Sequence, residues 1–215
     1  MQNIRTILFD LDGTVIDTAD SIINTYRHTL IEMGVELPAR ADMMKLIGPG
    51  MVYNFTRLVG EERVPEAIAL YRDYYANTSM FEAKPYDQMA ETLARFKQAG
   101  KDMIIATSKF RDFAEILIKH FGFDQFFSSV YGAVSEPALH KKSDIIALAL
   151  RERGLAPCDT IMIGDRDNDV ISAKGNDISS IGALWGYGSE AELRKAGAVG
   201  LAAQPRDLLH LILGG

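Results

Sequence analysis

Two carboxylates stand two residues apart near the N-terminus, directly after a short apolar run. Asp10 and Asp12 follow Thr6–Phe9 and come just before Gly13. Because residues two apart in a strand point the same way, both side chains are predicted to converge at the strand's carboxyl end. Gly13 would allow a sharp turn there. That edge of a doubly wound sheet binds ligands, although such a pair alone is also typical of a turn or a helix cap.

A second acidic set follows another apolar run. Asp165 comes directly after Thr160–Ile163, and Asp169 lies four residues further on. Asp169 shares the side of Asp165 if a helix begins there. At roughly 4 Å and an effective dielectric of about 20, each pair of like charges costs about 4 kcal/mol. A hard divalent cation relieves that repulsion, and a site of oxygen ligands with few carboxylates suits Mg²⁺.

Groups that could bind an anion lie at two other places. Thr107 and Ser108 end the apolar run Met103–Ala106, so their hydroxyl and backbone N–H groups could face the same edge. Lys142 precedes an expected helix and could neutralise a phosphate there. Taken alone, Thr107 and Ser108 are as typical of a helix N-cap as of an anion site. A lone lysine such as Lys142 is more often a solvated surface charge.

Short apolar runs alternate with helical patterns over most of the chain. The expected strands are Thr6–Phe9, Met103–Ala106, Ser128–Tyr131, Thr160–Ile163 and Ser180–Leu184, and the expected helices between them are Tyr86–Gln98, Arg111–Phe121 and Ser143–Arg153. Nearly continuous apolar strands are typical of parallel sheets covered on both faces. The pattern therefore predicts an α/β fold with a doubly wound parallel sheet.

One segment interrupts this alternation. Residues 15–83 read as helices alone, with no strand-like run, and they are too many for one crossover. We expect an inserted α-helical domain over 15–83, and an α/β core formed by residues 1–14 and 84–215.

The net charge and the length of the apolar runs limit which partners the chain can have. Among 215 residues, 23 Lys+Arg against 29 Asp+Glu leave a net charge of −6, which argues against a nucleic-acid polymer as partner. No apolar run approaches the roughly 20 residues that span a bilayer, so we expect no membrane partner. The single cysteine, Cys158, forms no internal disulfide and favours the reducing cytoplasm.

Taken together, four stretches resemble the motifs of the haloacid dehalogenase-like (HAD) hydrolases, in order along the chain. Phe9–Val15 resembles the first motif, Thr107 the second, Lys142 the third and Gly164–Asp169 the fourth. Helix register favours Lys142 over Lys141. The resemblance covers nearly the whole chain and implies a Rossmann-like core with the insertion as a helical cap.

Two further stretches resemble particular branches of that family. Trp185–Gly188 is similar to the phosphoglycolate phosphatase branch, and the stretch from Tyr131 to Lys142 resembles a bacterial 5′-nucleotidase-like group. In the cap, a loop containing Ile47, Gly48 and Pro49 resembles the loop that sets substrate specificity in capped relatives.

The resemblance implies a phosphatase acting through an aspartyl-phosphate. Asp10 would be the nucleophile and Asp12 the acid and base, while Thr107, Ser108 and Lys142 would bind the phosphoryl oxygens. Mg²⁺ would be held by the Asp10 carboxylate, the Asp12 backbone carbonyl and Asp165, with Asp169 and Gly13 in support.

The expected substrate is a small phosphorylated metabolite, either phosphoglycolate-like or a 5′-nucleotide. Asp12 argues against a dehalogenase, because dehalogenases lack this second acid. A phosphomutase on the same core and a catalytically silent phosphate sensor remain as alternatives.

Overall fold

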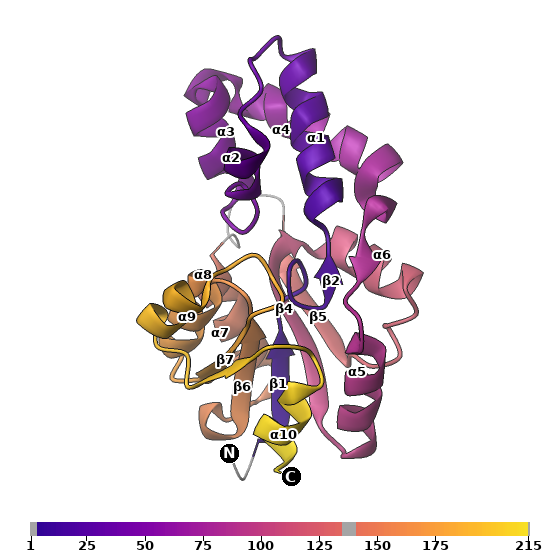
Figure 1. Ribbon diagram of the computed structural model, residues 1–215, viewed down its shortest axis with the longest axis vertical. Helices are drawn as coiled ribbons and strands as arrows, with labels where there is room; N and C mark the ends of the chain where they lie inside the picture. The colour runs from indigo at the N-terminus through magenta and orange to yellow at the C-terminus, as the bar shows by residue number, and fades with distance from the viewer. Residues whose placement is uncertain (1–3, 135–140, 215) are drawn as a thin grey trace. The chain divides into compact units, whose positions relative to one another are not determined.

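The computed structural model describes residues 4–134 and 141–214, which form two compact units. One unit contains residues 1–16 and 85–215, and the other contains residues 17–84. The chain crosses from one unit to the other twice, close to residues 16 and 84 (Figure 1). Each unit has its own core and is described by itself.

The first unit is built on a six-stranded sheet in the order β5-β4-β1-β6-β7-β8, in which neighbouring strands pair in parallel. The strands are β1 (Thr6–Phe9), β4 (Asp102–Phe110), β5 (Ser129–Ala133), β6 (Thr160–Gly164), β7 (Ser179–Ala183) and β8 (Gly200–Ala202). The predicted α/β fold with a parallel sheet is confirmed. Because β1 lies between β4 and β6, the residues that follow these strands meet at one edge.

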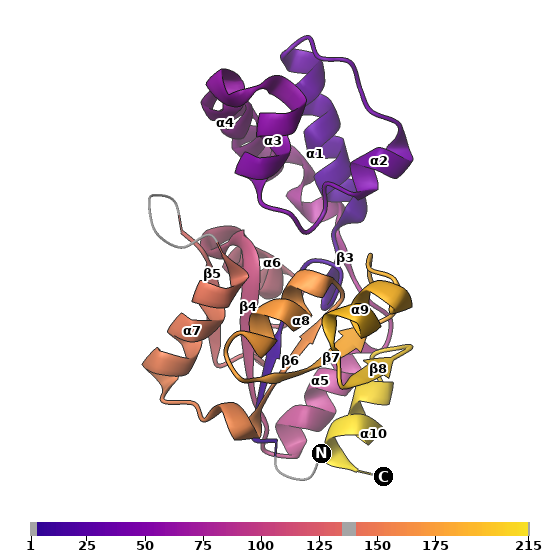
Figure 2. The same cartoon turned by 90° about the vertical axis from the view of Figure 1, so that its left-hand side faces the viewer.

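Helices cover both faces of this sheet. Helices α5 (Met89–Gln98) and α6 (Arg111–His120) lie on one face, and α7 (Lys142–Arg153) and α8 (Asp167–Lys174) on the other (Figure 1). Helix α9 (Glu190–Ala196) packs beside α8, and α10 (Asp207–Leu213) packs against α5 and β8 (Figure 2). Among the described residues, no helix combines the length and apolar character needed to cross a membrane.

Strand β1 packs against the helices on both faces of the sheet, which explains the three consecutive apolar residues Ile7–Phe9. All four of its residues are buried. Leu8 packs with residues of α7 and α8, including Ile145 and Ala173. Phe9 packs on the opposite face, where its ring lies 6.4 Å from Phe96. This two-sided burial holds β1, and the acidic loop that follows it, in the middle of the sheet.

The strands differ from the predicted ones in three places. Strand β8 was not predicted, and β4 runs to Phe110 instead of ending at Ala106. The segment expected to be purely helical begins with a short strand, β2 (Ile16–Asp17), which pairs with β3 (Lys84–Pro85) in a separate two-stranded sheet. Strands of two or three residues are too short for a hydrophobic period to reveal them.

The second unit is helical apart from its ends. It contains α1 (Ala19–Glu32), α2 (Arg40–Met44), α3 (Met51–Val59), α4 (Val64–Tyr74), one π-helical turn (Tyr75–Ser79) and two 3₁₀ turns (Glu61–Arg63 and Met80–Glu82). Its core is aromatic: the Tyr26 ring lies 5.1 Å from Phe55 and 4.9 Å from Tyr71. These buried rings join α1, α3 and α4 into one body.

Candidate active site

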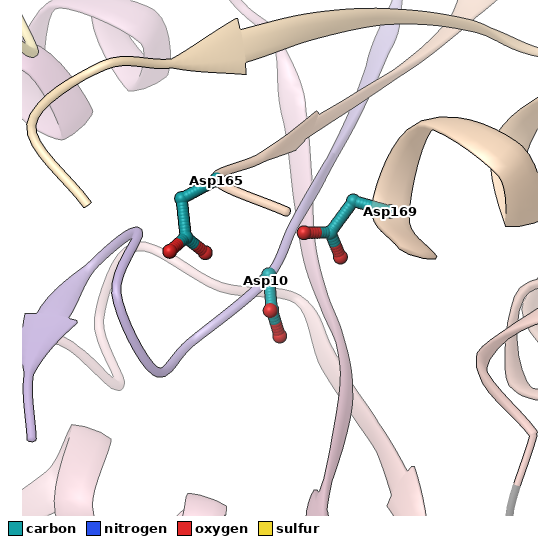
Figure 3. A group of neighbouring side chains, drawn as sticks. All are labelled: Asp10, Asp165 and Asp169. Carbon is teal, nitrogen blue, oxygen red and sulfur yellow. The ribbon is translucent and has the colours of Figure 1, made fainter. Parts of the chain in front are cut away.

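Three buried carboxylates meet at the carboxyl edge of the sheet. Asp10 follows β1, Asp165 follows β6 and Asp169 lies in the first turn of α8 (Figure 3). One oxygen of each lies within 4.8 Å of those of the other two. The parallel pairing of β1 with β6 brings together residues that are 155 positions or more apart in sequence.

Backbone groups fix the direction of these carboxylates. The Leu11 N–H donates to Asp10 Oδ1 over 2.8 Å, and the Arg166 N–H donates to Asp169 Oδ2 over 3.0 Å. Asp165 accepts from the Tyr187 N–H at 2.7 Å. Each acid is therefore anchored by a main-chain donor, which leaves little freedom to rotate away from the others.

Lys142 is the buried cation of the site. Its Nζ lies 2.7 Å from Asp10 Oδ2 and also pairs with Asp169 Oδ1, and the residue is 4% exposed. Burial disfavours its charge, yet Asp10 and Asp169 together raise the pKa of Lys142, which keeps it protonated. Lys141 is exposed at the N-cap position of α7. Of the two lysines, Lys142 is the one within reach of the acids.

One lysine does not balance three carboxylates. Burial, with the charges of Asp169 and Asp10, raises the pKa of Asp165 to about 8. Burial raises the pKa of Asp169 to about 6, against the opposing charge of Lys142. The burial and mutual repulsion of these acids disfavour their ionised forms, and a divalent cation would offset that cost. The oxygen-only donor set and the excess negative charge fit a hard cation such as Mg²⁺.

Asp12 lies apart from the carboxylate cluster and has a partner that the sequence did not reveal. Its Oδ1 and Oδ2 lie 3.0 Å and 3.1 Å from Lys109 Nζ. Both side chains are largely buried, at 18% exposure for Asp12 and 7% for Lys109. Lys109 follows Thr107 by two residues, and this strand spacing, which places both side chains on one face, is the sequence feature that could have pointed to it. The pairing of β4 with β5 becomes irregular between Ala106 and Phe110, so a regular strand pattern could not place it.

The other predicted residues of this edge lie in three different settings. Thr107 is buried, and its Oγ1 accepts from the Lys109 N–H at 3.2 Å. Ser108 is partly buried. Gly13 has φ +82°, and a Cβ on it would lie 2.4 Å from Asp165 Oδ2. A side chain at position 13 would therefore collide with the acid that follows β6.

Glu192 on α9 is a second residue that sequence reasoning missed. Its Oε1 accepts from Arg166 Nε at 2.8 Å and from the Asp167 N–H at 2.9 Å. This carboxylate ties α9 to Arg166 and Asp167, which lie between Asp165 and Asp169. No motif marks the residue, because its role arises only when α9 packs against α8.

The loop expected to set specificity lies in the second unit. Ile47 is buried, whereas Gly48 and Pro49 are exposed. The Asn54 side chain, 2% exposed, donates to the Leu46 carbonyl at 2.8 Å and the Pro49 carbonyl at 3.4 Å. It fastens both ends of the loop to α3. The stretch from Tyr131 to Lys142 that resembles the nucleotidase-like group lies partly outside the described residues, at 135–140.

Known proteins with similar sequences and structures indicate the family. A 5′-nucleotidase of Pseudomonas aeruginosa is 35% identical over 190 residues, covering 87% of this chain and 86% of that protein. The tyrosine-protein kinase PtkA of Mycobacterium tuberculosis is 32% identical over 184 residues, which are 86% of this chain but 63% of the kinase. The crystal structure of a predicted phosphatase from Clostridium acetobutylicum matches with a TM-score of 0.93 at 33% identity, covering 99% of both chains.

The family match extends across most of the chain and includes the edge where the acids meet. Residues 7–183 match the family described as haloacid dehalogenase-like hydrolase. This range contains Asp10, Lys142 and the loop from Asp165 to Asp169. The chain belongs to the haloacid dehalogenase-like hydrolases.

Proposed function

We propose that this hydrolase is a Mg²⁺-dependent phosphatase that cleaves a small phosphate monoester through an aspartyl-phosphate on Asp10. The observation that carries the proposal is the buried set of Asp10, Asp165 and Asp169, held against Lys142 at the carboxyl edge of the sheet. A carboxylate is already an ionised nucleophile near neutral pH and needs no base to activate it. Family membership supports the reaction class, the hydrolysis of phosphate esters.

Mg²⁺ would be held by the Asp10 and Asp165 carboxylates and by the Asp12 backbone carbonyl. Lys142 already pairs with Asp10 and Asp169, whereas Asp165 forms no ion pair with a lysine in the described part of the chain. When bound, the ion would offset the negative charge of the acids and of the phosphoryl oxygens. Asp169 would act by orienting Lys142.

In the first step, an oxygen of Asp10 attacks phosphorus and the bond to the ester oxygen breaks. Asp12 supplies the proton to the leaving oxygen. In the second step, Asp12 takes a proton from water as that water attacks phosphorus, which frees Asp10 and releases inorganic phosphate. Lys109 contacts both oxygens of Asp12 and so fixes the direction of the carboxyl group between the two steps.

The phosphoryl oxygens need donors and positive charge at the same edge. Lys142 supplies charge, and the Thr107 hydroxyl and the Ser108 backbone N–H would supply hydrogen bonds. Thr107 is buried and Ser108 is partly exposed, and both lie in the last four residues of β4. Because these groups stand on the core, binding of the phosphoryl group is proposed to be a property of the core alone.

We propose a 5′-nucleotide or a phosphoglycolate-like ester as the substrate. The 35% identical 5′-nucleotidase supports the first, and the similarity of Trp185–Gly188 to the phosphoglycolate phosphatase branch supports the second. The helical unit is proposed to be the cap that selects between such substrates. The single cysteine supports the cytoplasm as the compartment.

The test is hydrolysis of p-nitrophenyl phosphate by the purified chain. We expect release of p-nitrophenol and phosphate in Mg²⁺, loss of this release in EDTA and recovery on adding excess Mg²⁺. A panel of phosphorylated metabolites, read out as inorganic phosphate, would then identify the preferred ester. Conversion of a substrate to its isomer in the presence of a bisphosphate would indicate a mutase instead. Phosphate binding without turnover of any ester would contradict the proposal.

Replacing Asn54 with leucine tests the role of the loop in the cap. Leucine is similar in size but donates no hydrogen bond, so the Leu46 and Pro49 carbonyls lose their anchor. We expect the KM for the preferred metabolite to rise about 5-fold, which corresponds to about 1 kcal/mol. The kcat for p-nitrophenyl phosphate should stay unchanged, because the chemistry lies on the core. Asn77→Leu, at an exposed position of the same unit, is the control. An unchanged KM in folded Asn54→Leu would contradict this role.

A further inference from the structure

The segment Trp185–Gly188, which follows β7, encloses the Asp165 side chain with its backbone. A Cβ on Gly186 would lie 2.3 Å from Asp165 Cβ and 2.3 Å from the Gly13 carbonyl oxygen. A Cβ on Gly188 would lie 1.9 Å from the Asp165 carbonyl oxygen. These distances are below the 3.0 Å that Cβ atoms essentially never cross, and backbone atoms cannot rotate away. The close approach therefore requires glycine at both positions.

Hydrogen bonds join this segment to both oxygens of Asp165. The Tyr187 N–H donates to Oδ2 at 2.7 Å, and the Thr14 hydroxyl donates to Oδ1 at 3.3 Å. The Trp185 indole N–H in turn donates to the Thr14 carbonyl at 2.9 Å. One oxygen is thus held by the segment itself, and the other by a residue that the segment anchors.

Enclosing the charged Asp165 side chain raises the free energy of the site when no cation is bound. The residue is fully buried beside two other carboxylates. Removing water from the acid and fixing it toward its like-charged neighbours raises the free energy of the empty site. The same arrangement presents an oriented carboxylate to an incoming cation without further ordering.

We propose that Trp185–Gly188 is a positioning element that builds the cation site by fixing the orientation of the Asp165 carboxylate. The inference rests on the proposed function, because it takes Mg²⁺ as the ligand of Asp10 and Asp165. It adds that cation affinity depends on a segment 20 residues and more beyond the acid, none of whose side chains is among the proposed ligands.

Trp185 offers a readout that needs no catalysis. It is the single tryptophan of the chain, and its ring packs edge-on against Tyr86 at 6.5 Å. Its indole N–H donates to the Thr14 carbonyl, and the Thr14 hydroxyl donates to Asp165 Oδ1. Binding of Mg²⁺ to the unmodified chain should therefore change the fluorescence emission of Trp185. The Mg²⁺ concentration at the midpoint of this change should agree with the dissociation constant measured by calorimetry.

The experiment compares Gly186→Ala with Gly175→Ala and the unmodified chain, by isothermal titration with Mg²⁺ in the absence of substrate. Gly175 has an ordinary helical φ of −64°, and the Ile171 carbonyl oxygen would lie 3.5 Å from an added Cβ, an ordinary contact distance. Gly175→Ala should bind as the unmodified chain does. Gly186→Ala should bind Mg²⁺ about 10- to 100-fold more weakly. Circular dichroism checks that each variant is folded.

Trp185→Phe decides the matter if Gly186→Ala does not fold. Phenylalanine keeps a ring beside Tyr86 and removes only the donor to Thr14, so we expect Mg²⁺ affinity to fall about 5-fold. Unchanged affinity in folded Gly186→Ala, unchanged affinity in Trp185→Phe, or an equal loss in Gly175→Ala would overturn the inference. If the unmodified chain bound no Mg²⁺, the proposed function would fail first, and the inference with it.

Discussion

Asp10→Asn is expected to lower kcat for p-nitrophenyl phosphate at least about 100-fold, the scale for loss of a group that takes part in the chemistry. Asparagine has the same shape and keeps an oxygen that can accept from the Leu11 N–H, which lies 2.8 Å from Asp10 Oδ1. Its neutral amide is not a nucleophile toward phosphorus, so no aspartyl-phosphate can form. The assay is run at saturating Mg²⁺, because Asp10 is also a proposed cation ligand.

Two measurements separate the loss of a nucleophile from the loss of a fold. Thermal unfolding without metal should show that Asp10→Asn is folded, since Lys142 loses its pairing with Asp10 but keeps Asp169, and one of three mutually repelling buried carboxylates is gone. Asp177→Asn is the control, because Asp177 is exposed and its φ of +58° is one that asparagine adopts readily. Undiminished turnover in Asp10→Asn would refute the nucleophile assignment.

Lys142→Met is expected to reduce both catalysis and stability. Its ammonium is buried and pairs with Asp10 and Asp169, so methionine leaves these carboxylates without a counter-charge. Removing one partner of a buried ion pair costs about 3–5 kcal/mol, which chemical denaturation without metal should detect. If Lys142 binds the phosphoryl group as proposed, loss of its positive charge should lower kcat/KM about 100-fold or more.

Lys141→Met is the matched control, because it is the same substitution at the neighbouring residue. Lys141 is exposed, whereas Lys142 is 4% exposed. The control should keep its activity and its free energy of unfolding. A large loss in Lys141→Met, together with an active Lys142→Met, would assign the lysine of the third motif to position 141.

The sequence predicted the central strands well because their chemistry is local. Strands β1 and β6 are short apolar runs that are followed by Asp10 and Asp165. The sequence shows both the apolar run and the polar residue that ends it. Strand β8 contains only Gly200–Ala202 and has no such run. Helix α8 begins with Asp167-Asn168-Asp169, so its polar first turn conceals a helical period.

The supporting residues of the site were harder to predict than its acids. Lys109 reaches Asp12 from an irregular stretch of β4, and Glu192 reaches Arg166 from a separate helix. Both contacts depend on how distant elements pack, and a single sequence carries no spacing rule for that. The enclosure of Asp165 by Gly186 and Gly188 is of the same kind, since the glycines are recognisable but their neighbour is not.

The pairing of β2 with β3 determines how well the fold tolerates changes in the length of the segment between them. The two crossings of the chain run next to each other, and the Tyr86 N–H donates to the Val15 carbonyl at 3.3 Å. The 17–84 segment therefore joins the first unit as a closed loop whose two ends are held together by the β2–β3 pairing. Because the entropy of closing a loop grows only slowly with its length, this segment can be enlarged, trimmed or exchanged while the path of the surrounding chain stays the same.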